Sequence, residues 1–203
     1  MTSKKQLTVV IVCVIIGILS TSVYAVRLLS KKIALKKMLP EAEKIIEETR
    51  KLTKEEKESI KKKLGGMMVF YQPGSESEKV YERNEYTFYF GMKSDKKTGV
   101  AIIEKQPGKW GPVEYIIALD ANTAKVTDLA VMSYTERRGR PIARRNFLKQ
   151  FVGKHNKDPI RVMKDIRGIT GATISCVATC FAVKKISTMY EVLYLTENKK
   201  SKE

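Results

Sequence analysis

The longest apolar stretch of the chain lies at its N-terminus. Leu7 to Val26 contain no charged side chain, and Lys4 and Lys5 precede them. This length matches the roughly 20 residues that a bilayer-spanning helix needs. A cleaved signal peptide is the alternative, because the small residues that end at Ala25 resemble a cleavage site. Both interpretations place the chain in the export pathway, so residues 1–30 are expected to be a membrane anchor or signal segment.

The charges beside this stretch bear on its orientation. On the positive-inside rule, the excess of basic residues after it would keep the C-terminal side in the cytoplasm. The rule can be overridden by the passenger domain, and the resemblance described below favours an uncleaved single-pass anchor in the cell membrane with the C-terminal domain on the extracytoplasmic side. The basic residues after the stretch are Arg27, Lys31, Lys32, Lys36 and Lys37.

Residues 31–66 mix acidic and basic side chains with apolar ones at helical spacing. Thr53 to Glu56 resembles a capping box, which predicts a helix start there. Gly65 and Gly66 end the pattern. The segment is therefore predicted to be a charged helical stalk between the anchor and the domain, without chemistry of its own.

Beyond Gly65 the hydrophobic pattern changes to that of β-strands. Turn residues such as Pro107-Gly108 separate short runs rich in β-branched and aromatic residues. Short connections between consecutive strands favour an antiparallel meander. The predicted strands are residues 67–71, 85–92, 99–104, 113–119 and 125–134.

Two helices are predicted after these strands. Residues 141–152 place apolar side chains such as Phe147 and Phe151 on one face, and residues 173 to about 195 repeat that pattern over a longer span. Strands followed by helices indicate an α+β domain over residues 67–203, with an antiparallel sheet flanked by helices.

Composition and charge narrow the chemistry. The net charge of +17 is compatible with nucleic acid, anionic lipid or an acidic protein partner. Cys176 and Cys180 share a helix face and are expected to be small buried residues. With His155 as the single histidine, neither a Ser-His-Asp triad nor a metal site is supported, and no catalytic residue is predicted. A function that depends on a cofactor fits better.

The most informative segment is Gly168 to Ser175, which reads Gly-Ile-Thr-Gly-Ala-Thr-Ile-Ser. Thr170 or Thr173 can cap the helix that follows, and Gly171 lets another group approach the backbone closely. The N–H groups and the dipole at a helix N-terminus also favour a phosphate. The residues themselves leave both interpretations open, an ordinary N-cap and a phosphate site.

The last six residues of this segment resemble the Ser/Thr-Gly-Ala-Thr flavinylation motif of the FMN-binding domain family. Members include the C subunit of the Na⁺-translocating NADH:quinone reductase and the G subunit of the Rnf electron-transport complex. In this family a flavin transferase joins the phosphate of FMN to the last Thr of the motif through a phosphoester, and Thr173 holds that position here. The resemblance implies that the neighbouring motif residues shape the site, namely Thr170, Gly171, Ala172, Ile174 and Ser175.

Three upstream blocks extend the resemblance over roughly residues 99–193, in the order of the family. The block at 108–120 is similar to the strand that enters the flavin-side sheet, and it makes Trp110 a candidate neighbour of the flavin. The block at 134–139 resembles the Glu-x-x-Gly turn, which adds Glu136 and Gly139. The block at 147–154 resembles the Phe-Leu-x-Gln-Phe helix.

The resemblance departs from the family at one position. Many members have an Asp shortly before the motif, near Arg167 of this chain, where the nearest acid is Asp165. If that Asp helps the transferase to recognise its target, its replacement would make covalent attachment inefficient or abolish it. The family fold and noncovalent binding of FMN are compatible with the replacement.

The resemblance implies a membrane-anchored extracytoplasmic flavoprotein that carries covalent FMN and transfers electrons in a respiratory or related redox chain. Its enzyme class stays open between an electron-transfer flavoprotein and a subunit of an oxidoreductase complex. Expected partners are the membrane, redox donor and acceptor proteins or quinone, the flavin transferase and the other subunits of a larger complex, but no nucleic acid. Two alternatives remain: a flavin-dependent sensory or regulatory module, and a cofactor-free basic module that binds anionic partners.

Overall fold

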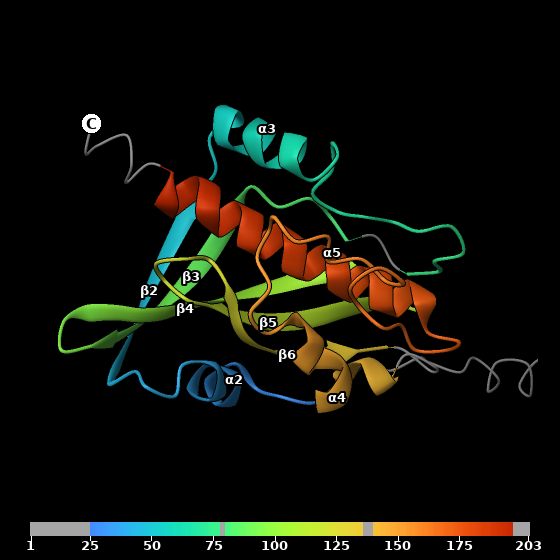
Figure 1. Ribbon diagram of the computed structural model, residues 1–203, viewed down its shortest axis with the longest axis horizontal. Helices are drawn as coiled ribbons and strands as arrows, with labels where there is room; N and C mark the ends of the chain where they lie inside the picture. The colour runs from blue at the N-terminus through green and yellow to red at the C-terminus, as the bar shows by residue number, and fades with distance from the viewer. Residues whose placement is uncertain (1–24, 78–79, 136–139, 197–203) are drawn as a thin grey trace, which may run out of the picture.

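The computed structural model describes residues 25–77, 80–135 and 140–196. Within them, six strands form one antiparallel sheet in the order β1-β6-β5-β4-β3-β2 (Figure 1). The central part is the predicted meander, in which consecutive strands pair directly. The strands are β1 (Val26–Arg27), β2 (Lys44–Lys51), β3 (Glu85–Lys93), β4 (Lys96–Pro107), β5 (Pro112–Leu119) and β6 (Val126–Tyr134).

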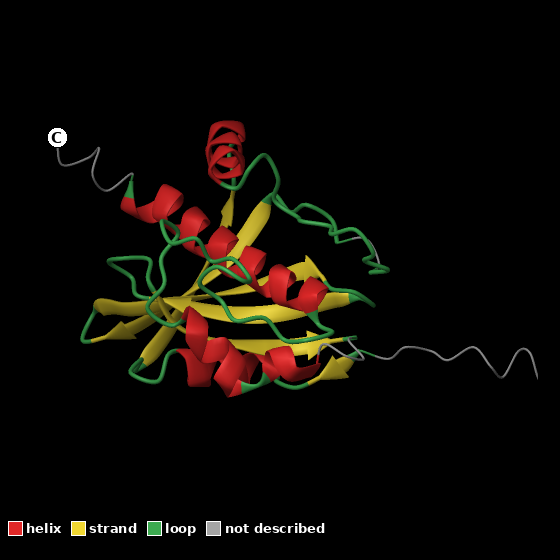
Figure 2. Ribbon diagram, turned by 45° about the vertical axis from the view of Figure 1, so that its right-hand side comes forward, coloured by secondary structure: helices red, strands yellow, loops and turns green. Residues whose placement is uncertain are grey.

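Helices cover both faces of the sheet (Figure 2). The longest, α5 (Thr173–Tyr190), crosses one face and continues into a π-helical turn, η3 (Glu191–Leu195). α2 (Lys31–Met38) packs on the opposite face, and α3 (Lys54–Lys63) lies against α5 and η3. Beside β6 lies a series of short helices, η1 (Arg140–Ala143), α4 (Arg145–Leu148) and η2 (Lys149–Phe151).

The core has two layers because side chains alternate between the two faces of each strand. On β5, Tyr115 and Ile117 join the cluster under α5, whereas Ile116 and Ala118 join the cluster under α2. All four are fully buried. Burial on both faces explains why β5 is a nearly continuous apolar run, whereas a strand with one wet face would alternate.

The prediction of a helical stalk over residues 31–66 is wrong. β2 occupies the middle of this segment and pairs along its whole length with β3, as the edge strand of the sheet. α2 buries Ala34, Leu35 and Met38 against the sheet instead of standing in solvent. The helical spacing of apolar residues in β2 was outweighed by pairing with β3, since strand formation depends on neighbouring strands more than on intrinsic preference. The helix start at Thr53 is confirmed, with a capping box to Glu56.

Two further element predictions need correction. Residues 67–71 form no strand and run as an irregular segment over the α5 side of the sheet. The single helix expected over 141–152 is broken into η1, α4 and η2. Within the described part of the chain, no helix is long and apolar enough to cross a membrane. The apolar stretch predicted to be an anchor lies outside the described residues except for its last two.

Candidate functional site

The Thr-Gly-Ala-Thr segment ends at the first turn of α5. Thr173 is the first residue of the helix and is exposed. Gly171 has a φ of 77°, and open space surrounds the position where a Cβ would stand. The N-cap is Ala172, and no side chain caps this end of the helix. The capping role considered for Thr170 and Thr173 is therefore wrong, and the N–H groups of the first turn remain suited to an anion.

The loop after α3 meets the N-terminus of α5 and also contacts the β4–β5 turn (Figure 1). Gln72 Nε2 donates to the carbonyl of Ile174 at 2.8 Å, which joins the loop after α3 to the first turn of the helix. The same loop contacts the β4–β5 turn, where Ser75 Oγ donates to the carbonyl of Gly108 at 2.5 Å and Glu76 N donates to that of Lys109 at 2.6 Å. The turn residues Pro73, Gly74 and Ser75 predict a loop here, but its contacts with the start of α5 and with the β4–β5 turn were not expected, because no local motif records them.

The β4–β5 turn also lies against the end of β6. A Cβ added to Gly111 would stand 1.8 Å from Thr135 Oγ1, so glycine is required for this close approach. Among the described residues, the buried Thr135 Oγ1 has no hydrogen-bond partner. Trp110 is half-buried in the same turn, with the Lys109 ammonium 4.8 Å from its ring centroid. Glu136 and Gly139, predicted to line the site, lie outside the described residues.

The loop before the motif is held by the short helices beside β6. Gln150 Oε1 accepts from Arg167 N at 2.8 Å, and Gln150 Nε2 donates to Arg167 O at 3.2 Å. Asp165 is occupied within its own loop, where it accepts from Arg161 N at 2.8 Å and pairs with Lys154 Nζ at 2.9 Å. Burial raises the pKa of Asp165, but these donors outweigh it and hold the pKa below its usual range. Its carboxylate is thus a structural group of the loop.

The start of α5 is fixed to the sheet by hydroxyl groups. Thr179 Oγ1 lies 3.1 Å from Tyr115 Oη on β5 and donates to the carbonyl of Ser175 at 2.8 Å. Ser175 and Ala172 are buried, whereas Ile174 is partly exposed. The helix terminus is consequently a rigid platform, which suits a site that must hold a group in place.

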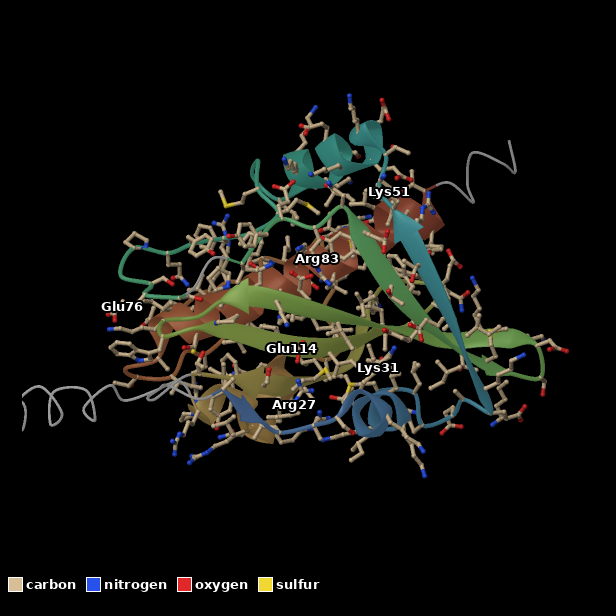
Figure 3. All side chains as sticks on the ribbon, turned by 180° about the vertical axis from the view of Figure 1, so that it is seen from behind. Arg27, Lys31, Lys51, Glu76, Arg83 and Glu114 are labelled. Carbon is tan, nitrogen blue, oxygen red and sulfur yellow. The ribbon has the colours of Figure 1, made fainter. Side chains whose placement is uncertain are left out.

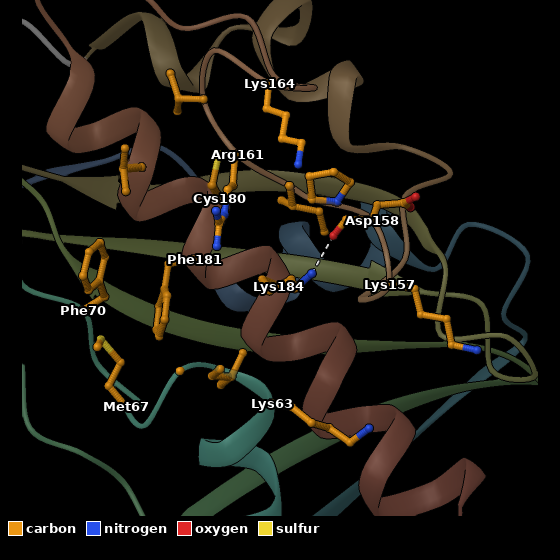
Figure 4. Close-up of a pocket in the computed structure, with 16 residues that line it drawn as sticks. Lys63, Met67, Phe70, Lys157, Asp158, Arg161, Lys164, Cys180, Phe181 and Lys184 are labelled. Atoms are coloured by element: carbon orange, nitrogen blue, oxygen red, sulfur yellow. Dashed lines mark hydrogen bonds between the residues drawn. The ribbon is translucent and has the colours of Figure 1, made fainter.

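A groove of about 790 Å³ runs along the outer face of α5 (Figure 4). Val177 and Phe181, which lie on the same face of α5 as Thr173, form part of its floor. The ring centroid of Phe181 lies 5.5 Å from that of Phe70. Burial, and then the charge of Arg161, lower the pKa of Lys184, whose Nζ donates to Asp158 O at 2.5 Å. The groove can accept an apolar or aromatic group that carries negative charge. Its basic lining residues are Lys63, Lys157, Arg161, Lys164 and Lys184.

The sequence around this site matches the model of a known protein family. The model of the FMN-binding domain matches residues 108–187, a range that includes the β4–β5 turn, the Gln150 block and Thr173. The resemblance to the FMN-binding domain family is thereby confirmed.

The fold agrees with that of another protein. The crystal structure of NqrC from Shewanella oneidensis superposes with a TM-score of 0.51 at 12% identity, covering 81% of this chain and 88% of that chain. At this identity the likeness concerns the fold. No curated protein sequence matches the chain.

The residues at the start of α5 fit the phosphate end of FMN. An exposed threonine hydroxyl stands at an uncapped helix N-terminus, and the open side of Gly171 leaves space beside it. The structure brings Thr170, Gly171 and Thr173 together at one turn, with the Gln72–Ile174 contact linking them to the loop that meets the Trp110 turn. When bound, FMN would supply the redox chemistry, and the chain would supply its position and surrounding charge.

Proposed function

We propose that this protein is a membrane-anchored extracytoplasmic flavoprotein that carries FMN on Thr173 and transfers electrons in a respiratory or related redox chain. The observation that carries the proposal is the position of Thr173. Its side chain is exposed at the uncapped N-terminus of an 18-residue helix, inside the range that matches the FMN-binding domain. A phosphate diester at this point would lie on the positive end of the helix dipole.

The proposed linkage is a phosphoester between Thr173 Oγ and the phosphate of FMN. Its formation by a flavin transferase adds FMN and removes the elements of one water. The surrounding motif supports this assignment, because Thr170, Gly171, Ala172, Ile174 and Ser175 all stand within one turn of the helix start. Trp110 in the β4–β5 turn is a proposed neighbour of the bound flavin, and the resemblance to the family adds Glu136 and Gly139 to this proposal.

The test of the linkage is intact mass together with in-gel flavin fluorescence of the denatured full chain, exported and coexpressed with a flavin transferase. We expect a mass increase of one FMN less one water in the wild type and in Thr127→Ala, an exposed threonine on β6. Thr173→Ala should lose both signals. An unmodified wild-type chain, or a modified Thr173→Ala variant, would reject Thr173 as the attachment residue.

The electron-transfer role is supported by the groove along α5, the helix that begins at Thr173. The groove along α5 is apolar in its floor and basic at its rim, which suits an acidic redox partner or a negatively charged flavin. Donor and acceptor are proposed to be proteins of a larger redox complex or a quinone. Stopped-flow reduction and reoxidation of the flavinylated chain tests this role. The sensory alternative would be favoured by two results together: no physiological reductant reduces the flavin, and ligand-dependent signalling through a partner persists.

The membrane anchor is proposed from the apolar stretch at residues 7–26, and the extracytoplasmic location is proposed from the resemblance to the FMN-binding domain family. Protease treatment of intact and permeabilised cells separates the possibilities. An extracytoplasmic domain is digested once the cell envelope outside the membrane is opened, whereas a cytoplasmic domain stays protected until the membrane itself is broken.

A further inference from the structure

The surface formed by β1, α2 and the residues between them carries exposed apolar and basic side chains together. We call it the β1–α2 face. Val26, Leu28 and Ile33 are 41%, 42% and 59% exposed, although each is a large apolar residue. The exposed basic side chains of this face are Arg27, Lys31, Lys32, Lys36 and Lys37.

The helix geometry explains why these side chains share the outer surface of α2. Ala34, Leu35 and Met38 are buried against the sheet. Ile33 lies three and four residues before Lys36 and Lys37, so the three project from the opposite side. Lys32, Lys36 and Lys37 form no ion pair within the described part of the chain, whereas Lys31 is held by Glu47 at 3.1 Å.

The β1–α2 face follows the N-terminal apolar stretch directly, without a linker between them. Val26 pairs with Tyr134 in the sheet, and Leu28 N donates to Met132 O at 2.7 Å. Val26 is also the last residue of the apolar stretch 7–26. No spacer therefore separates the apolar stretch from the folded domain, and the β1–α2 face is the surface next to it.

We propose that the β1–α2 face lies on a membrane surface that contains anionic phospholipid, with its apolar side chains among the headgroups and its lysines against lipid phosphates. Apolar residues ringed by lysines are the arrangement that interfacial helices use. Each Lys or Arg near an anionic lipid surface strengthens binding by roughly fivefold. The proposal rests on the anchor proposed above, and it is independent of the flavin.

The opposite side of the molecule provides an internal control. α3 lies across the sheet from α2 (Figure 1) and exposes Lys54 and Lys62. No exposed large apolar side chain stands on α3 within the described residues. Arg27 and Lys31 appear on the α2 side of the molecule, and Lys51 appears beside α3 (Figure 3). General attraction of a basic protein to anionic lipid would act on both sides, whereas the proposed contact acts on the β1–α2 face.

The experiment is lysine acetylation of the full chain in nanodiscs, with the rate at each lysine read by mass spectrometry. Discs of phosphatidylcholine are compared with discs that also contain phosphatidylglycerol. We expect Lys32, Lys36 and Lys37 to react several-fold more slowly in the anionic discs, while Lys54 and Lys62 keep their rates. In 1 M salt, where the screening length falls to about 3 Å, the difference should shrink.

Equal rates at the two sets of lysines in anionic discs would overturn the proposal, as would slowing that is the same in both kinds of disc. Extraction of the discs' protein with alkaline carbonate tests the anchor separately. A chain that resists extraction but whose α2 lysines are not protected would contradict the membrane contact of the β1–α2 face. It would still support the membrane anchor. A Thr173→Ala chain with the wild-type footprint would show that the contact does not depend on the flavin.

Discussion

Gln150 holds both backbone polar groups of Arg167, accepting from its N–H at 2.8 Å and donating to its carbonyl at 3.2 Å. Gln150 lies in η2, and Arg167 lies in the loop that leads to the Thr-Gly-Ala-Thr segment. The side-chain amide of Gln150 therefore satisfies both the N–H and the C=O of Arg167, as a residue of a paired strand would. This contact gives a physical role to the glutamine of the Phe-Leu-x-Gln-Phe block, because it sets the path of the chain toward Thr173.

Replacing Gln150 with Ala should loosen the loop before the motif. Each polar group left without its partner costs about 1–3 kcal/mol when buried and less where water can reach it, so we expect a loss of about 1–2 kcal/mol. Urea unfolding measures the free energy, and the fraction of chain that acquires flavin measures the site. Lys149→Ala, at the exposed neighbouring position, is the control. Unchanged stability and flavin content would mean that Gln150 does not position the loop.

Gly111→Ala should be strongly destabilising, because its Cβ would lie 1.8 Å from Thr135 Oγ1 and 2.8 Å from Thr135 Cβ. Separating the β4–β5 turn from β6 to relieve this overlap is expected to cost about 1–3 kcal/mol, which thermal unfolding can detect. The double variant Gly111→Ala, Thr135→Gly removes the opposing side chain. A double variant that is more stable than the sum of the two single-variant free-energy changes predicts would identify the contact. A double variant whose free-energy change equals that sum would contradict it.

In the buried ion pair of Lys185 and Glu104, substitution of Glu104 should lower the free energy of unfolding more than substitution of Lys185. Their charged atoms lie 2.7 Å apart, and Glu104 also pairs with Arg83 at 2.8 Å. Glu104→Gln leaves the ammonium of Lys185 buried without a counter-charge, at an expected cost of about 3–5 kcal/mol. Lys185→Met leaves Glu104 paired with Arg83 and should cost less. Equal losses in urea unfolding would refute this asymmetry.

The same pair predicts a loss of stability at high pH. Burial lowers the pKa of Lys185, but the charge of Glu104 outweighs it and raises the pKa above its ordinary value of 10.5. A raised pKa means that the pair stabilises the fold fully below about pH 10.5 and less as the pH rises through the folded-state pKa. Unfolding free energies of the wild type and Lys185→Met, measured from pH 8 upward, should therefore converge in the alkaline range. A constant difference between them would contradict the assignment.

Cys180 should be unreactive in the native protein. Burial raises the pKa of its thiol to about 12, and burial also raises that of Cys176. At pH 8 roughly one Cys180 thiol in ten thousand would be ionised. A thiol titration of the Cys13→Ser variant should give almost no reaction until denaturant is added. Rapid reaction in the folded state would point instead to a redox role for this pair.

The basic rim of the groove should raise the reduction potential of the proposed flavin. Positive charge favours the state with more electrons, so Arg161→Gln and Lys164→Gln are expected to lower the potential. An interaction on the order of 1 kcal/mol for each charge corresponds to about 20 mV for a two-electron couple. Lys54→Gln on α3 serves as the charge-matched control. An equal shift in that control would assign the effect to net charge.

The sequence determined the elements whose pattern is local. The alternation in β3 to β6 and the turn residues between them follow from the pleat and from turn chemistry, so the meander could be predicted without the tertiary structure. The long apolar pattern that begins at Thr173 identified α5 for the same reason. The position of Thr173 at its first turn was also readable, because the motif stands directly before that pattern.

Tertiary contacts decided the remainder. β2 is a strand because β3 offers it a free edge, and the spacing of its apolar residues alone favoured a helix. The groove, the Gln150–Arg167 contact and the fit of Gly111 to Thr135 each join residues that are distant in sequence. No local pattern records such pairings, since they depend on how the helices and loops pack around the sheet. Thus the sequence predicted that Thr173 stands at the start of α5, and the fold determined which loops, charges and apolar side chains surround this helix.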